Sequence, residues 1–254
     1  MDSNGIPGRG SRNGGASTLK LSTRKITVVG LLGALTVALG FMPVGGFIPV
    51  PTPAGSATTM HIPTILAGIL EGPGAGALVG GIFGAFSFWR AQTNPNPVAK
   101  LMFSNPLIAF LPRILIGVAS HYVFCLGKGT FGRAVLMCAT VAALGHTGYW
   151  SFSNQPLAWR WAAAILLGAV GVLAIVLINR KSGSQGPALA AISGSAINTI
   201  GVMGLSVLFG YVPVQAAVAV GVTHGIPEAL VAMILTDLIY RGTRRVRGQE
   251  KPAT

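Results

Sequence analysis

The sequence predicts an all-α integral membrane protein with about eight transmembrane helices. Of its 254 residues, 51% are apolar and only 9% are charged. Several apolar runs approach the roughly 17 to 25 residues that a helix needs to cross a hydrocarbon core of about 30 Å. Charged residues lie almost entirely in the short segments between these runs. This pattern argues against a soluble protein, whose helices carry charged outer faces.

The chain begins with a polar tail and a first apolar helix. Residues 1–18 are rich in Gly, Ser, Asn and Arg and contain few apolar side chains, so we expect a disordered tail. Lys20, Arg24 and Lys25 then precede the apolar run 26–42. Such a run imitates a signal peptide, but no convincing small-residue cleavage site follows it. We therefore expect the first transmembrane helix here.

The next segment, 43–57, contains four prolines and repeated glycines, which exclude a regular helix. It also carries the apolar residues Phe47, Ile48 and Val50. Two interpretations remain open. The segment either folds down over a pocket or simply connects two helices.

A membrane hairpin is predicted over residues 58–89, with two apolar arms joined by the break Glu71-Gly72-Pro73-Gly74. Its second arm places Gly76, Gly80 and Gly84 four residues apart on one helical face. Small residues at this spacing let another helix approach at backbone distance inside lipid. That helix could belong to this chain or to a partner protein.

Five further apolar runs follow, at 102–126, 131–150, 159–178, 187–209 and 216–240. We expect four transmembrane helices within 19–126, an inserted hairpin at 127–186, two more helices within 187–242 and a basic tail at 243–254. Cys125 and Cys138 lack the spacing of metal ligands, so they are interpreted as small core residues.

The distribution of Lys and Arg predicts the orientation. With eight spans and a cytoplasmic N-terminus, only Arg90, Lys100 and Arg160 fall in outer loops, and the other basic residues of the loops and tails are cytoplasmic. We therefore expect a multi-pass protein of the cell membrane with both termini in the cytoplasm. The formal charge of +13 is spread along the flanks of the spans, which does not suit a nucleic-acid groove.

Four short stretches follow one another along the chain: MHIPTILAGILEGPGAGALVGGIFGAFSF, SNPLIAFLPRILIG, GSAINTIGVMG and THGIPEALVAMIL. In this order they resemble the substrate-binding S components of energy-coupling-factor (ECF) transporters. The resemblance implies a six-helix core that binds a vitamin or related micronutrient in its outer half. It also implies partnership with a transmembrane T component and two cytosolic ATPases, and no enzymatic activity in the S component itself.

The resemblance further implies that small residues on the first and third helices face the T component. Here these residues are Ala34, Ala38, Gly76, Gly80 and Gly84. The sequence departs from the family at 127–186, where about 60 residues replace a short connection. Two additional spans would preserve the topology and leave the six-helix core intact.

Several polar residues within apolar runs are candidates for ligand binding: Arg113, Asn198, Thr199, His224, Glu228, Asn105 and His61. Arg113 lies about eight residues into its span, where a charge costs at least about 2.5 to 3.5 kcal/mol on insertion scales. Its guanidinium could bind a ligand anion such as a carboxylate. Alternatively, it could pair with Glu228 or bond carbonyl groups freed by Pro112.

His224 and Glu228 are four residues apart and therefore project to one helical face. They could contact a ligand or form a structural group with Arg113. Asn198 and Thr199 could bind a vitamin's heteroatoms or bond a neighbouring helix. Asn105 could instead be a helix cap, and His61 lies at the start of the hairpin.

No cofactor and no metal are expected. The sequence contains no GxxxxGK[ST] motif, so energy for uptake would come from partner ATPases. An autonomous ion-coupled carrier remains the alternative, because Glu228 could be a buried coupling residue. The ligand stays open between small anionic vitamins, such as pantothenate or niacin, and a bulky one such as cobalamin.

Overall fold

The computed structural model describes residues 22–42, 47–49, 56–93, 97–127 and 185–246, together with Ala134, Cys138 and Gly145. The predicted tail at 1–18 and nearly all of the predicted hairpin at 127–186 lie outside the described residues. The total of eight spans therefore stays a prediction.

The described part is helical apart from two short strands. Its helices are α1 (Thr23–Phe41), α2 (Ile62–Glu71), α3 (Pro73–Ala91), α4 (Pro97–Phe103), α5 (Pro106–Leu126), α8 (Gly186–Leu208), α9 (Val214–Thr223) and α10 (Gly225–Val246), and its strands are β1 (Phe47–Pro49) and β2 (Ser56–Thr58). Four helical segments of this part are long and apolar enough to cross a membrane, namely 23–41, 106–126, 186–208 and the combined segment 214–245.

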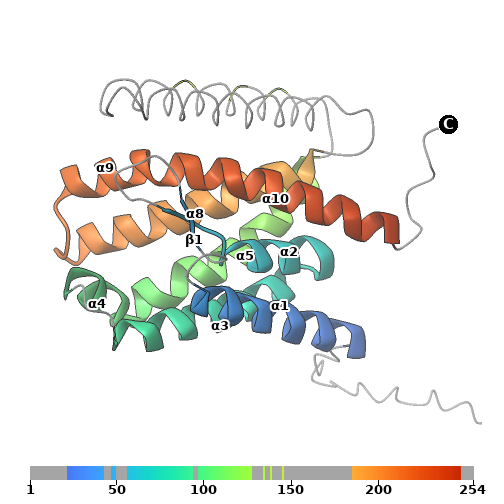
Figure 1. The fold of residues 1–254 in the computed structure, drawn as a ribbon, viewed down its shortest axis with the longest axis horizontal. Helices are drawn as coiled ribbons and strands as arrows, with labels where there is room; N and C mark the ends of the chain where they lie inside the picture. Colours follow the sequence, from blue (N-terminus) through green and yellow to red (C-terminus); the bar gives the residue numbers. More distant parts are fainter. Residues whose placement is uncertain are drawn as a thin grey trace, which may run out of the picture.

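The long helices lie side by side in the order α1, α3, α5, α8 and α10, with α9 continuing the line of α10 (Figure 1). Helix α2 contacts α1, α3, α5, α8 and α10, so it lies inside the bundle. Its residues Ile65, Leu66 and Ala67 are accordingly buried. Apolar side chains of α2, α3, α5, α8 and α10 form the main core cluster between the helices.

The first arm of the central hairpin differs from its prediction. Helix α2 contains only 10 residues, which at 1.5 Å per residue is about 15 Å, half of a hydrocarbon core. It ends at Gly72, whose φ of 94° suits glycine and lets the chain turn into α3. The N-terminal end of α2 is therefore inside the bundle, where His61 begins it.

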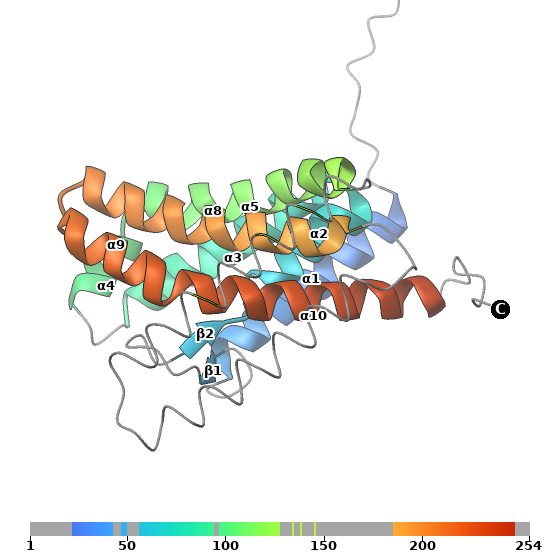
Figure 2. The same cartoon turned by 90° about the horizontal axis from the view of Figure 1, so that it is seen from above.

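Strands β1 and β2 form an antiparallel pair within the loop after α1, with Phe47 opposite Thr58. β2 contacts α10, and Figure 2 shows both strands beside that helix. The prediction of a loop without helix is confirmed for its described residues. Of the two interpretations left open, this position favours a segment folded against the helices.

Gly76, Gly80 and Gly84 are buried against α5 rather than facing outward. A Cβ at Gly76 would meet the backbone of Gly117, and one at Gly84 would meet Phe110. The expectation that these three glycines face a T component is therefore corrected. The chain's own fifth helix uses the close approach that they permit.

Ala34 and Ala38 are instead exposed on α1. They share their surface with Leu31 and Leu35, which are 69% and 44% exposed. The opposite side of α1 packs on α3, where a Cβ at Gly33 would meet Ile82. The small-residue face of α1 thus has no neighbour among the described residues.

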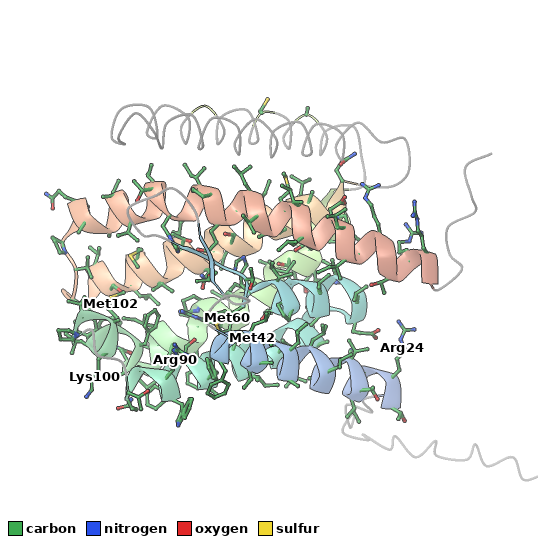
Figure 3. All side chains as sticks on the ribbon, in the orientation of Figure 1. Arg24, Met42, Met60, Arg90, Lys100 and Met102 are labelled. Carbon is green, nitrogen blue, oxygen red and sulfur yellow. The ribbon has the colours of Figure 1, made fainter. Side chains whose placement is uncertain are left out.

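Two ion pairs lie outside the cavity in the described part of the chain. Arg24 at the start of α1 (Figure 3) lies 2.8 Å from Glu71, so that carboxylate is paired rather than free. Asp237 and Arg241, four residues apart on α10, form an ion pair at 2.6 Å. The two cysteines are free but exposed, so their interpretation as core residues is wrong.

Candidate functional site

A cavity of about 300 Å³ lies where β2, α3, α5, α8 and α10 meet. Five of the seven predicted ligand residues line it, namely Arg113, Asn198, Thr199, His224 and Glu228. Figure 3 labels two further lining residues, Met60 and Arg90, between the α1–α3 side and α10. Thr58 and Ser87 also line the cavity, and aromatic and aliphatic side chains provide the rest of its surface.

Arg113 is only 4% exposed, yet no carboxylate pairs with it within the described residues. Its Nη1 donates a hydrogen bond of 2.7 Å to the carbonyl of Ile108. That carbonyl is free because Pro112, four residues later, has no N–H to donate. The predicted carbonyl bond therefore exists, but it uses only one of the five guanidinium donors.

The rest of the guanidinium lies between two aromatic rings. Its carbon is 5.3 Å from the ring centroid of Phe83 and 4.9 Å from that of Phe103. Its Nε is buried and has no hydrogen-bond partner in the described part of the chain. A cation held by ring faces with donors to spare is suited to a planar anion such as a carboxylate.

Glu228 also lines the cavity, and three side chains lie around its carboxylate. Thr58 Oγ1 donates a hydrogen bond of 2.5 Å to its Oε1. His224 Nε2 lies 3.1 Å from Oε2, and His61 Nδ1 lies 3.2 Å from Oε1. The His61 nitrogen lacks the alignment of a hydrogen bond. These partners come from β2, the start of α2 and the break between α9 and α10.

That helix break explains how Glu228 reaches the cavity. The last predicted span is divided into α9 and α10 at His224 and Gly225, two residues before Pro227. Glu228 lies in the first turn of α10, where the positive end of the helix dipole stabilises a carboxylate. Broken helices of this kind provide polar groups inside membrane transporters.

Asn198 and Thr199 come from α8. The Oδ1 atom of Asn198 is buried and has no hydrogen-bond partner among the described residues, so a ligand donor could satisfy it. The methyl group of Thr199 faces Gly225, at which an added Cβ would lie 3.0 Å away. Thr199 therefore packs in the wall between α8 and α10.

Two predicted residues do not line the cavity. Asn105 caps α5, because its Oδ1 accepts a hydrogen bond of 3.0 Å from the Leu107 N–H. His61 is fully buried behind Glu228. We therefore assign His61 to positioning Glu228 and Asn105 to starting the helix that carries Arg113.

Four further residues line the cavity that were not predicted from the sequence, namely the aromatic residues Phe83 and Phe103 and the polar residues Thr58 and Arg90. Arg90 Nη1 donates a hydrogen bond of 2.6 Å to the Gly40 carbonyl, which joins α3 to the end of α1. Aromatic residues are common in membrane helices, so the sequence around Phe83 and Phe103 does not indicate that their rings lie beside a cation. Arg90 looked like an ordinary loop cation.

The fold and the cavity define a helical membrane protein with an internal site of small-molecule size. The family description "ECF transporter, substrate-specific component" matches residues 24–240. The chain belongs to this family, which confirms the resemblance found in its four sequence stretches.

Two relatives are named as transporters of one vitamin. The chain is 35% identical over 151 residues to the "Pantothenate transporter PanT" of Leuconostoc mesenteroides, covering 59% of this chain and 63% of that protein. It is 30% identical over 129 residues to the "Pantothenic acid transporter PanT" of Lactococcus lactis, covering 44% of this chain and 65% of that protein. The matches thus span slightly less than two thirds of each relative.

Proposed function

We propose that this protein is the S component that captures pantothenate, or a closely similar small carboxylate, for an ECF-type importer. The observation that carries the proposal is Arg113, a buried cation that faces the cavity with unused donors and no carboxylate partner in the described part of the chain. Leaving such a charge unpaired is costly unless a ligand anion offsets it. The names of the two relatives favour pantothenate among small anionic vitamins.

The chemistry of pantothenate complements the cavity. Its terminal carboxylate would pair with Arg113 between Phe83 and Phe103, and its amide and hydroxyl groups would face Asn198, His224 and Glu228. Glu228, when ionised, accepts hydrogen bonds only, so it favours ligand groups that donate. The volume of about 300 Å³ lies at the small end of ligand sites, which disfavours bulky cobalamin.

The matched ligand pantothenol tests this arrangement, because it replaces the carboxylate of pantothenate by an alcohol and keeps the rest. Calorimetry on purified protein should give tight binding of pantothenate and much weaker binding of pantothenol. Niacin and cobalamin complete the panel. Absence of pantothenate binding, with no vitamin released from purified protein and detected by mass spectrometry, would refute the proposal.

For delivery, we propose that the protein acts with a T component and two ATPases. Ala34 and Ala38 carry over from the sequence prediction as docking residues, because they are exposed on α1. On α3 the accessible small residues are the half-buried Gly81 and the exposed Ala85 rather than the three buried glycines, and a Cβ at Gly81 would meet nothing within 4 Å. Helices α1 and α3 are in contact, so these residues can form one flat face for a close helix approach.

The alternative is a carrier that couples uptake to an ion gradient, for which Glu228 is the candidate coupling group. Three side chains already surround its oxygens, which favours a fixed role in ligand binding. Reconstitution of the protein alone into liposomes separates the two functions. Concentrative uptake under an imposed ion gradient would support the carrier and refute dependence on ATPases.

A further inference from the structure

A second hollow lies between α8 on one side and α9 and α10 on the other, with a volume of about 910 Å³. On α8 it extends from Ile192 to Val207, and on the other side from Val214 to Leu230. At 1.5 Å per residue the α8 side is about 22 Å long, which exceeds one leaflet of a hydrocarbon core of about 30 Å. We call this hollow the α8–α10 crevice.

Small residues keep the crevice open. Gly204 and Gly221 line it from opposite sides, and a Cβ at Gly204 would meet nothing within 4 Å. Larger side chains at these positions would fill the space between the helices. The sequence therefore leaves a long groove along a helix pair that could otherwise pack closely.

The apolar lining of the crevice does not suit ordered water molecules. Thr199 is the only lining residue with a polar side chain among those of the described chain, and a buried water needs two to four polar partners. The surrounding surface is apolar and exposed, since Ile200, Val214 and Val218 are 72%, 57% and 58% exposed. No other described segment lines the crevice, and in a membrane a surface that no protein segment covers faces lipid, so we place its open side towards the bilayer.

We propose that the α8–α10 crevice binds an acyl chain of a membrane phospholipid. An acyl chain matches the crevice in length, in its direction along the transmembrane helices and in its lack of polar groups. The site lies outside the polar cavity, and its occupant comes from the bilayer rather than from the transported ligand.

The bound chain would also support the wall of the ligand cavity. Thr199 and Met203 line both the crevice and the polar cavity, so a chain in the crevice packs directly behind them. An empty crevice would leave this wall without van der Waals contacts on one side. We therefore expect pantothenate affinity to fall when the chain is displaced, and this second step rests on the proposed function.

Photo-crosslinking tests the site. The protein is reconstituted into phosphatidylglycerol nanodiscs that contain a phosphatidylglycerol with a diazirine in its acyl chain, and labelled peptides are mapped by mass spectrometry. The reference surface is the exposed side of α5 around Leu111 and Leu115, which are 42% and 43% exposed. Residues 192–207 and 214–230 should be labelled several-fold more strongly than this surface. The proposal is overturned if both surfaces are labelled equally. It is also overturned if the crevice peptides are not labelled, because another segment or protein then covers them.

Variants give a second readout. Gly204→Leu and Gly221→Leu together should fill the crevice and reduce its labelling to the level of α5. Gly30→Leu is the matched control, because a Cβ there also meets nothing within 4 Å and it lies on α1, outside the crevice. Labelling that is unchanged in the filled variant would also overturn the proposal. If wild-type protein shows the crevice labelling but binds no pantothenate, the proposed function fails while the lipid site stands.

Discussion

Gly80 of α3 packs against the backbone carbonyl of Arg113 in α5, so a Cβ at this glycine would collide with the residue that carries the cavity's buried cation. The absence of a side chain at Gly80 thus lets α5 approach α3 closely at the position of Arg113. Backbone on both sides leaves no flexible group that could move aside.

Gly80→Ala should therefore destabilise the protein by about 1 to 3 kcal/mol, the usual cost of overpacking. The neighbouring substitution Gly81→Ala is the control, since its Cβ meets nothing within 4 Å, and alanine stabilises a helix interior by about 0.5 to 1 kcal/mol relative to glycine. Thermal unfolding in detergent compares the two. Equal midpoints would contradict the close contact of α3 with α5.

Arg113→Ala should weaken pantothenate binding by about 2 to 5 kcal/mol, because the ligand carboxylate would lose its partner in a buried site. Binding of pantothenol should change much less, since that ligand has no carboxylate. Calorimetry with both ligands on folded protein measures the difference. An equal loss for the two ligands would assign Arg113 to structure rather than to carboxylate recognition.

Thr58→Val should accelerate pantothenate dissociation, because β2 would lose its hydrogen bond to Glu228 and bonds to charged groups contribute about 1.5 to 3 kcal/mol. Hydrogen exchange of residues 56–58 should also become faster. Thr93→Val is the control, as Thr93 is exposed and bonds only the Arg90 carbonyl in the described structure. Unchanged dissociation rates and unchanged exchange would show that Thr58 does not hold the strand.

Ala34→Trp should leave pantothenate affinity near the wild-type value but abolish co-purification with the T component and ATPases, and with it uptake. A bulky side chain on α1 would hold the proteins too far apart for packing contacts. Leu115→Trp is the control, because it changes an exposed residue of α5. If Ala34→Trp co-purifies with the T component and ATPases as well as the wild-type protein does, α1 is not part of the docking face.

The eight-span topology predicts that residues 151–158 lie outside the cell and that both termini are cytoplasmic. Single cysteines introduced at Ser151 and Ala158 should react with a membrane-impermeant thiol reagent added to intact cells, in a background without Cys125 and Cys138. Protection in intact cells, with labelling only after lysis, would place this turn in the cytoplasm and contradict the model of an inserted hairpin.

The sequence by itself determined the membrane class, the family and most of the cavity's polar residues. Apolar runs, breaks at Pro and Gly, and charges inside those runs are local features, and Arg113 and Glu228 are recognisable because a charge at such a position is costly wherever the chain folds. The capping role of Asn105 was also foreseeable from the proline that follows it.

Only the tertiary structure decided which helix each helix face packs against. The spacing of Gly76, Gly80 and Gly84 predicted a close helix contact, but their partner is α5 of the same chain. Arg113 and Glu228 line one cavity without pairing, and His61 lies behind Glu228. These relationships join residues far apart in the sequence, and their geometry depends on how the whole bundle packs, which no local pattern encodes.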